Sequence, residues 1–453
     1  MTVRFDDSLP KFVGIIAAEL GNTALAEGVV LRDAVGRLAF FSASELDERT
    51  VSRVQDRVIR ELGSYARTDR SVAGASDYGV SAVLNDPTSL RMTVEGQRIR
   101  LVDRRLVGGD WLRAPAPAPP PPPRLVFASL KGGVGRSTAI SVTAAELASK
   151  GRRVLVVDLD MEAPGLGAAL LDKSTLPPFG TIDALVESAF GPPDPSFLAD
   201  LTGPSPLAGQ HGKIDVIPAF GSRSIDNPGE ILAKLARAYA EGVGRDGGAA
   251  TILDRVRSLI DTFSDATRYD VILVDARAGL HETTASAILG LGAEVFLFGL
   301  NEPQTFEGYS ALLTHLARFI EPDSPAPEWL TRISAVHAKA NSDIDDRVDF
   351  ADRWNDLFTK TGLSPKRNAP DAVTKPDGPF SDVPWNDELS DKDVLPDDEW
   401  KPREPIVILY DDTFRLGPHR QRDLLSQRVY TIAFGDFLDH VTEIISAAEE
   451  GDE

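Results

Sequence analysis

The sequence predicts an α/β protein in which a doubly wound, mainly parallel sheet follows a small α+β domain. An apolar strand at 125–130 runs into a glycine-rich turn and then a helix. Two further apolar strands, at 152–160 and 269–275, each end in acidic residues. Apolar strands that alternate with helices are typical of a parallel sheet covered on both faces.

The small N-terminal domain is expected over residues 1–113. Two β-hairpins are predicted, one from the apolar runs at 28–32 and 37–41 and one from 90–94 and 97–102. A helix is predicted to start at 44–47 and to bury apolar residues that recur at helical spacing, namely Val51, Val54, Val58 and Leu62.

The arginines of this domain allow two interpretations. They could form a basic face for nucleic acid, or a solvated surface. Interspersed acids and the lack of an aromatic stacking pattern favour the solvated surface. The arginines in question are Arg53, Arg57, Arg60, Arg98, Arg100, Arg104 and Arg105.

Residues 114–123 consist of alanine and proline and predict a semi-rigid polyproline II linker. The second domain is therefore expected over residues 124–453. Its further strands are predicted at 213–218, 294–299, 331–336 and 405–410, with a helix at 305–320. The stretch at about 341–404 is rich in Asp and Pro and predicts an acidic, partly irregular insert.

The turn at 131–138 reads Lys-Gly-Gly-Val-Gly-Arg-Ser-Thr. Backbone N–H groups at Gly132, Gly133 and Gly135 can close on phosphate oxygens because glycine has no Cβ, and the following helix adds its positive end. The Ser137 hydroxyl stands where such loops place a Mg²⁺ ligand. A glycine-rich stretch can also be a mere flexible turn, but the acids at the neighbouring strand ends favour a phosphate-binding loop.

The octapeptide resembles the deviant Walker A loop of the ParA/MinD family of P-loop ATPases, in its KGGVGR variant. The resemblance implies a P-loop NTPase domain that binds ATP and Mg²⁺. In the family the first lysine, here Lys131, reaches across a nucleotide-sandwich dimer, which implies an ATP-dependent homodimer and a catalytic role for Lys131. The implied nucleotide-binding residues are Lys131, Gly132, Gly133, Val134, Gly135, Arg136, Ser137 and Thr138.

Arg136 departs from the family pattern, which has a second lysine on the β- and γ-phosphates. Arginine keeps the charge but is a longer, planar fork, so the exchange is not conservative at a tight phosphate site. We expect nucleotide binding to survive this exchange better than the catalytic rate does.

The strand-end acids complete the site that the resemblance implies. Asp158 and Asp275 match the acids that hold the Mg²⁺ shell together with Ser137, and Asp160 matches the acid that positions the attacking water. Acids at strand ends are commonly helix caps or solvated loop residues. Three motifs in the right order argue against that interpretation here.

Two charged residues near these strand ends have open roles. Arg277, which follows the strand at 269–275, is either a surface charge or a clamp on the nucleotide that supplies the charge Arg136 cannot place. Glu162 is either a solvated loop acid or a residue that couples the loop to its surroundings.

Composition limits the functional class. The chain of 453 residues has no Cys and a formal net charge of −21, which suits a cytoplasmic protein and opposes phosphate-backbone binding unless a basic patch is segregated. Nucleic acid is therefore an unexpected partner, possible only through the N-terminal domain. The tail at 439–453 is acidic and no apolar stretch is long enough to span a bilayer, so no membrane contact is expected.

Two functions follow from these observations. The first is an ATP-dependent dimerisation switch with slow hydrolysis, which acts on an unidentified protein partner. The second is a regulatory module that binds nucleotide without turnover, because Arg136 replaces the lysine.

Overall fold

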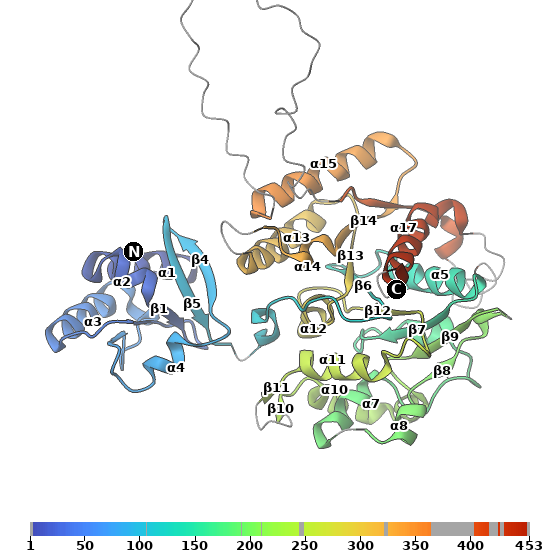
Figure 1. The fold of residues 1–453 in the computed structure, drawn as a ribbon, viewed down its shortest axis with the longest axis horizontal. Helices are drawn as coiled ribbons and strands as arrows, with labels where there is room; N and C mark the ends of the chain where they lie inside the picture. The colour runs from blue at the N-terminus through green and yellow to red at the C-terminus, as the bar shows by residue number, and fades with distance from the viewer. Residues whose placement is uncertain are drawn as a thin grey trace, which may run out of the picture.

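The computed structural model describes residues 3–105, 107–191, 193–209, 211–243, 249–320, 325–363, 403–415, 425 and 430–450. The N-terminal elements, coloured blue in Figure 1, lie at one end of the molecule. The elements from β6 onward form the larger body.

The N-terminal elements form a five-stranded sheet in the order β3-β2-β1-β5-β4. The two predicted hairpins are the antiparallel pairs β1/β2 and β4/β5, and β1 pairs with β5 in parallel. Helices cover both faces of the sheet. The bounds are α1 (Phe5–Leu20), α2 (Asn22–Glu27), β1 (Val29–Arg32), β2 (Leu38–Phe41), α3 (Glu48–Leu62), β3 (Val72–Ala73), α4 (Val80–Leu84), β4 (Leu90–Val94) and β5 (Gln97–Asp103).

The segment before the polyproline run belongs to the larger body. Trp111 is buried in that body's core, and Asp110 accepts a hydrogen bond of 2.8 Å from the backbone of Leu253. Ala116 N donates to the carbonyl of Leu289 at 2.7 Å. The chain therefore contacts the second core from Asp110 onward, and the domain boundary at residue 113 stays a prediction.

The larger body contains an eight-stranded sheet in the order β15-β14-β13-β6-β12-β7-β9-β8. The neighbouring strands pair in parallel, except β8 and β9. Its first half comprises β6 (Arg124–Ser129), α5 (Arg136–Ser149), β7 (Arg153–Asp158), α6 (Leu166–Leu170), α7 (Thr181–Glu187), α8 (Pro195–Ala199), β8 (Gly203–Pro204), β9 (Lys213–Ile217), α9 (Ser222–Asp226), α10 (Ile231–Ala238), β10 (Gly242–Val243) and β11 (Ala249–Ala250). Its second half comprises α11 (Ile252–Phe263), β12 (Val271–Asp275), α12 (Glu282–Gly290), β13 (Glu294–Gly299), α13 (Pro303–Leu316), α14 (Glu328–Thr331), β14 (Ile333–Ala340), α15 (Ile344–Thr361), β15 (Ile406–Leu409) and α17 (Thr431–Glu450).

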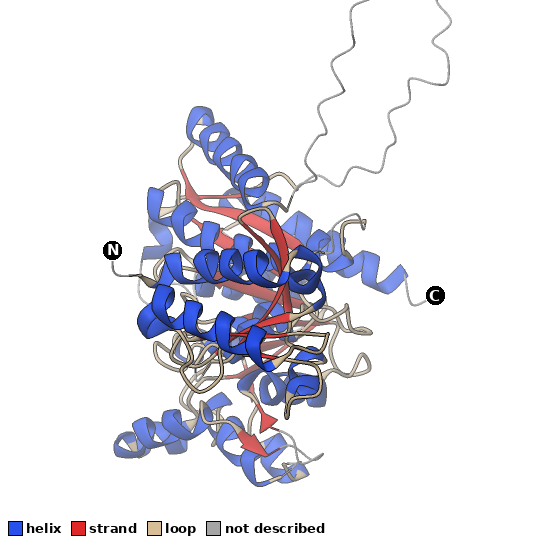
Figure 2. Cartoon of the chain, turned by 90° about the vertical axis from the view of Figure 1, so that its left-hand side faces the viewer, coloured by secondary structure: helices blue, strands red, loops and turns tan. Residues whose placement is uncertain are grey.

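Helices cover this sheet on both faces, as Figure 2 shows for the red strands between blue helices. One core lies under α5, α6 and α17, and the other lies under α7, α11, α12, α13 and α15. Each core is built from alternate residues of the same apolar strands, as a sheet buried on both faces requires. The predicted doubly wound, mainly parallel fold is confirmed.

The structure refines two sequence predictions in this region. The strand expected at 331–336 begins at Ile333 and continues to Ala340, because Thr331 ends the short helix α14. The stretch at about 341–404, expected to be acidic and partly irregular, contains the regular helix α15. Its buried Phe350, Trp354 and Phe358 recur every four residues, which places them on one face of a helix. Residues 364–402 of that stretch lie outside the described residues.

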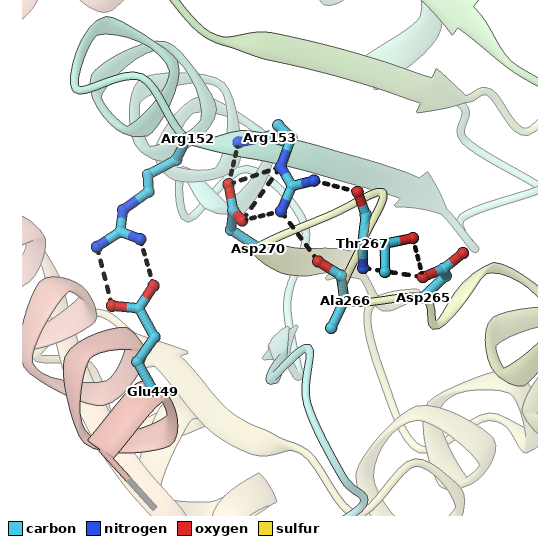
Figure 3. Close-up of polar contacts among 7 residues, drawn as sticks. All are labelled: Arg152, Arg153, Asp265, Ala266, Thr267, Asp270 and Glu449. Atoms are coloured by element: carbon cyan, nitrogen blue, oxygen red, sulfur yellow. Dashed lines mark hydrogen bonds and ion pairs between the residues drawn. The ribbon is translucent and has the colours of Figure 1, made fainter. Parts of the chain in front are cut away.

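Ion pairs stabilise the amino ends of the central strands β7 and β12 (Figure 3). Asp158 and Asp275 lie at the opposite, carboxyl ends of these strands. Arg153 at the start of β7 donates to Asp270, which precedes β12, through both its backbone N–H and its guanidinium. Arg152 pairs with Glu449 of α17. These contacts tie β7, β12 and the C-terminal helix together.

Candidate functional site

The candidate site lies where the carboxyl ends of β6, β7 and β12 meet. Asp158 and Asp275 stand directly opposite each other in the pairing of β7 with β12. Asp275 also stands opposite Phe127 of β6, two residues before β6 ends. The glycine-rich turn therefore leaves the sheet beside both acids, as ligand-binding loops of doubly wound sheets do.

The turn has the conformation that its glycines permit. Gly133 and Gly135 have φ of +77° and +101°, in the left-handed region that other residues avoid. Gly135 is the N-cap of α5, so the loop delivers its backbone N–H groups to the amino end of a 14-residue helix. The helix end and the N–H groups together suit an anion.

Arg136 is the first residue of α5 and is 7% exposed. Its guanidinium donates to Ser129 Oγ at 2.8 Å, and Nη2 lies 3.2 Å from Asp160 Oδ2. Its Nε lies 3.3 Å from Asp275 Oδ1. The side chain thus turns toward the strand-end acids, and its charge neutralises them.

Ser137 and Asp275 fit a magnesium ion. Ser137 Oγ donates to Asp275 Oδ2 at 2.7 Å. Asp275 Oδ1 is buried and accepts no hydrogen bond from the described residues, although Arg136 Nε lies 3.3 Å from it. Hydroxyl and carboxylate oxygens are the ligands that Mg²⁺ takes, with waters and phosphates completing its shell. No cluster of three or more His, Asp or Glu suited to a metal occurs in the described part of the chain. These residues would therefore hold the ion together with a bound phosphate.

Asp158 is fully buried, and both of its carboxylate oxygens accept backbone hydrogen bonds. Oδ1 accepts from Asp160 N at 3.0 Å and Oδ2 from Leu166 N at 3.3 Å. Burial raises the pKa of Asp158, and the nearby Asp275 raises it further. These bonds fix the turn from 160 to 166, so Asp158 positions this segment whether or not it also contacts the metal shell.

Burial also raises the pKa values of Asp160 and Asp275, and Arg136 opposes the rise in both. Removal of a charged group from water favours its neutral form, and a nearby opposite charge favours the ionised form. Arg136 is therefore the main counter-charge of these two acids in this structure.

Lys131 points away from these acids. Its Nζ lies 2.9 Å from Glu302 Oε2, and both side chains are close to half exposed. Glu302 precedes α13, so the pair joins the loop to the end of β13. Sequence reasoning missed Glu302, because its only signal is a place after an apolar strand.

Arg277 pairs with Glu162 at 2.8 Å. Glu162 also accepts a hydrogen bond from the hydroxyl of Tyr239, which follows α10. Glu162 thus joins the segments after β7 and β12 to the end of α10, and its coupling role stays a prediction. Arg277 lies near enough to Asp160 to oppose, weakly, the rise that burial causes in the pKa of that acid. Its predicted contact with nucleotide stays a prediction.

A cavity of about 310 Å³ opens on one side of the loop. Loop residues 133–138 form one wall, and the opposite wall comes from the ends of β14 and β15 and from α17. This opposite wall includes Lys339, Ile408, Tyr410 and Phe414. The sequence did not single out this wall, because it is assembled from segments far apart in the chain.

Comparison with known proteins gives one family match. A family model described as an AAA domain matches residues 124–176, which hold β6, the glycine-rich loop, α5 and β7. No curated protein sequence matches the chain.

Three of the similar solved structures contain a bound nucleotide or bound DNA. Cobyrinic acid a,c-diamide synthase from Mycobacterium smegmatis, with bound ADP and magnesium, is 19% identical over 51% of this chain and 80% of that chain, with a TM-score of 0.35. The pNOB8 ParA bound to nonspecific DNA is 17% identical over 73% and 99%, with a TM-score of 0.40. Cyanothece McdA in complex with ATP is 14% identical over 72% and 96%, with a TM-score of 0.41.

In the described part of the chain, no helix is both long and apolar enough to cross a membrane. The matched family model covers the loop on which the sequence resemblance was based. Together with the strand–loop–helix geometry, it confirms the predicted resemblance of this chain to P-loop ATPases of the ParA/MinD type, while the deviant form of the loop stays a prediction.

Proposed function

We propose that this protein is an ATP-dependent dimerisation switch that binds ATP with Mg²⁺ and hydrolyses it slowly. The observation that carries the proposal is the Ser137–Asp275 hydrogen bond beneath a glycine loop at the start of α5. It combines an anion site with two oxygen ligands for a divalent ion. A bound Mg²⁺ would neutralise charge on the phosphates during their transfer.

Lys131 supports the dimerisation step. Its side chain is close to half exposed and forms an ion pair with the similarly exposed Glu302, which is a weak contact. It is therefore available to a facing subunit. Asp160 is the group that would orient the attacking water, and release of its Oδ2 from Arg136 on nucleotide binding would make it a better acceptor.

The Arg136–Asp160 ion pair also favours the second candidate, a module that binds nucleotide without turnover. If the pair persists with ATP bound, Arg136 occupies Oδ2 of Asp160 and leaves this carboxylate less acceptor capacity for the attacking water. The two candidates share the binding site and differ only in hydrolysis.

The partner of the switch is proposed to be a protein in the cytoplasm. The net charge of −21 opposes binding to a phosphate backbone. Several arginines of the N-terminal unit are engaged internally, such as Arg57 with Glu19 and Arg100 with the carbonyl of Leu84. Nucleic acid is thus a less suitable ligand for that unit, and no membrane contact is proposed.

A phosphate-release assay on the full chain with Mg·ATP separates the candidates. The switch predicts slow release that Asp160→Ala abolishes, with the exposed Asp226→Ala as matched control. Release that is absent in the wild type, with ATP still bound, supports the non-hydrolysing module instead.

A further inference from the structure

Lys339 has an unusual backbone conformation close to the candidate site. It lies in β14, where the pairing with β15 shifts register between His337 and Ala340. Its φ is +53°, in the left-handed region that costs free energy for a residue with a Cβ. Strained residues of this kind concentrate at functional sites.

The side chain of Lys339 reaches the glycine-rich loop. Its Nζ donates to the carbonyl oxygen of Gly133 at 2.5 Å, and its Cε lies 3.8 Å from where a Cβ on Gly135 would be. Lys339 and loop residues 133–138 line the same cavity. An ammonium group has three donors, and the bond to Gly133 uses one of them.

Arg136 also lines this cavity, but its guanidinium contacts the strand ends. Its guanidinium contacts Ser129, Asp160 and Asp275, so two carboxylates already balance it. Lys339 brings a second positive charge to the loop from a different strand. Its side chain is exposed, so the ammonium can move toward a ligand without a large loss of packing.

We propose that Lys339 is a phosphate-binding residue of the nucleotide site. When ATP binds, its ammonium turns from the Gly133 carbonyl to a phosphate oxygen of the nucleotide and supplies charge that Arg136 directs to the acids. This assignment rests on the proposed binding of ATP. It also explains why a lysine, rather than glycine, occupies a left-handed position beside the loop.

Calorimetric titration of ATP and ADP, with Mg²⁺, into the full chain tests this assignment. Lys339→Met and Lys339→Gly should each lower the affinity for both ATP and ADP about tenfold, because each variant loses a charge-assisted hydrogen bond. Lys339→Arg should lose less, because it keeps the charge. The control is Lys360→Met, which removes an exposed lysine of α15 that pairs with Asp356 at 3.6 Å.

The glycine variant separates charge from backbone strain, because glycine adopts a φ of +53° without penalty. If Lys339→Gly binds ATP as tightly as the wild type, or if Lys339→Met does so, the assignment is overturned. If the wild type binds no ATP, the proposed function fails as well. Melting temperatures of all variants near that of the wild type ensure that lost affinity reflects the site and not unfolding.

Discussion

Arg136 Nη2 lies 3.2 Å from Asp160 Oδ2, so the basic residue of the loop is paired with the acid expected to orient water. Both side chains are about nine-tenths buried, with exposed fractions of 8% and 11%. Removal of one partner from such a buried pair strongly destabilises the fold, because the other charge is then left buried without a counter-charge. We therefore expect the pair to stabilise the site and, under the proposed function, to influence hydrolysis.

Arg136→Met is expected to lower the free energy of unfolding by about 3 kcal/mol, as the loss of one partner of a buried ion pair does. It leaves Asp160 and Asp275 without their main counter-charge. Chemical denaturation at pH 7 without nucleotide measures the change. As control, Arg152→Met removes the exposed pair with Glu449 and should cost less than about 1 kcal/mol. Equal effects of the two variants would contradict the structural role of Arg136.

Ser137→Ala is expected to remove most of the Mg²⁺ dependence of ATP affinity, since it deletes the hydroxyl that stands beside Asp275. Calorimetry with Mg²⁺ and with excess chelator gives the two affinities. The wild type should bind ATP at least about tenfold more tightly with the ion, a difference of about 1.4 kcal/mol. A Ser137→Ala protein that keeps this ratio would show that the metal is held elsewhere.

Glu302→Gln is expected to promote the ATP-driven dimer, because it frees Lys131 from its 2.9 Å ion pair. The effect should be small, at most about fivefold in the dimerisation constant, since exposed pairs are worth roughly 0–1 kcal/mol. Light scattering over a protein concentration series measures it. The exposed Glu307 on α13 provides the control variant, Glu307→Gln. A weaker dimer for Glu302→Gln would mean that Glu302 itself serves the interface.

The pH dependence of stability should reveal the Arg153–Asp270 contact shown in Figure 3. Burial opposes ionisation of Asp270, but hydrogen bonds from the Arg153 side chain and backbone outweigh it and lower the pKa of Asp270. A lowered pKa stabilises the fold above the unfolded value of about 3.9, and this stabilisation is lost as pH falls through the folded value.

Asp270→Asn should therefore cost about 1 kcal/mol at pH 7 and progressively less below pH ~4. Thermal unfolding of both proteins between pH 3 and 7 tests the trend. Asp226→Asn is a suitable comparison, because Asp226 is an exposed residue of α9 outside this contact. A stability difference that stays constant with pH would contradict the assignment.

Most of the fold could be predicted from local patterns in the sequence. The runs ending at Asp158 and Asp275 predicted two neighbouring parallel strands because apolar continuity and a terminal acid are visible within a few residues. The helix α15 was missed because its exposed face is highly acidic, which hides the spacing of Phe350, Trp354 and Phe358. Its buried face is defined by packing against α13, which no local pattern shows.

The candidate site was predictable only in part, for a similar reason. The loop and strand-end acids are separate motifs that the topology of a parallel sheet brings together. No sequence motif predicts which distant residues contact this loop. Glu302 reaches Lys131 and Lys339 reaches Gly133 across more than 170 residues of sequence, and only the folded chain shows these contacts.

The most direct test of the account is sedimentation velocity of the full chain with Mg·ATP, with Mg·ADP and without nucleotide. The account predicts a monomer without nucleotide and a dimer with ATP. It also predicts that Lys131→Ala stays monomeric while it keeps much of its ATP affinity, and that Asp160→Ala is trapped as the ATP-bound dimer. A wild type that remains monomeric with bound ATP, or a Lys131→Ala variant that dimerises equally well, would contradict the switch.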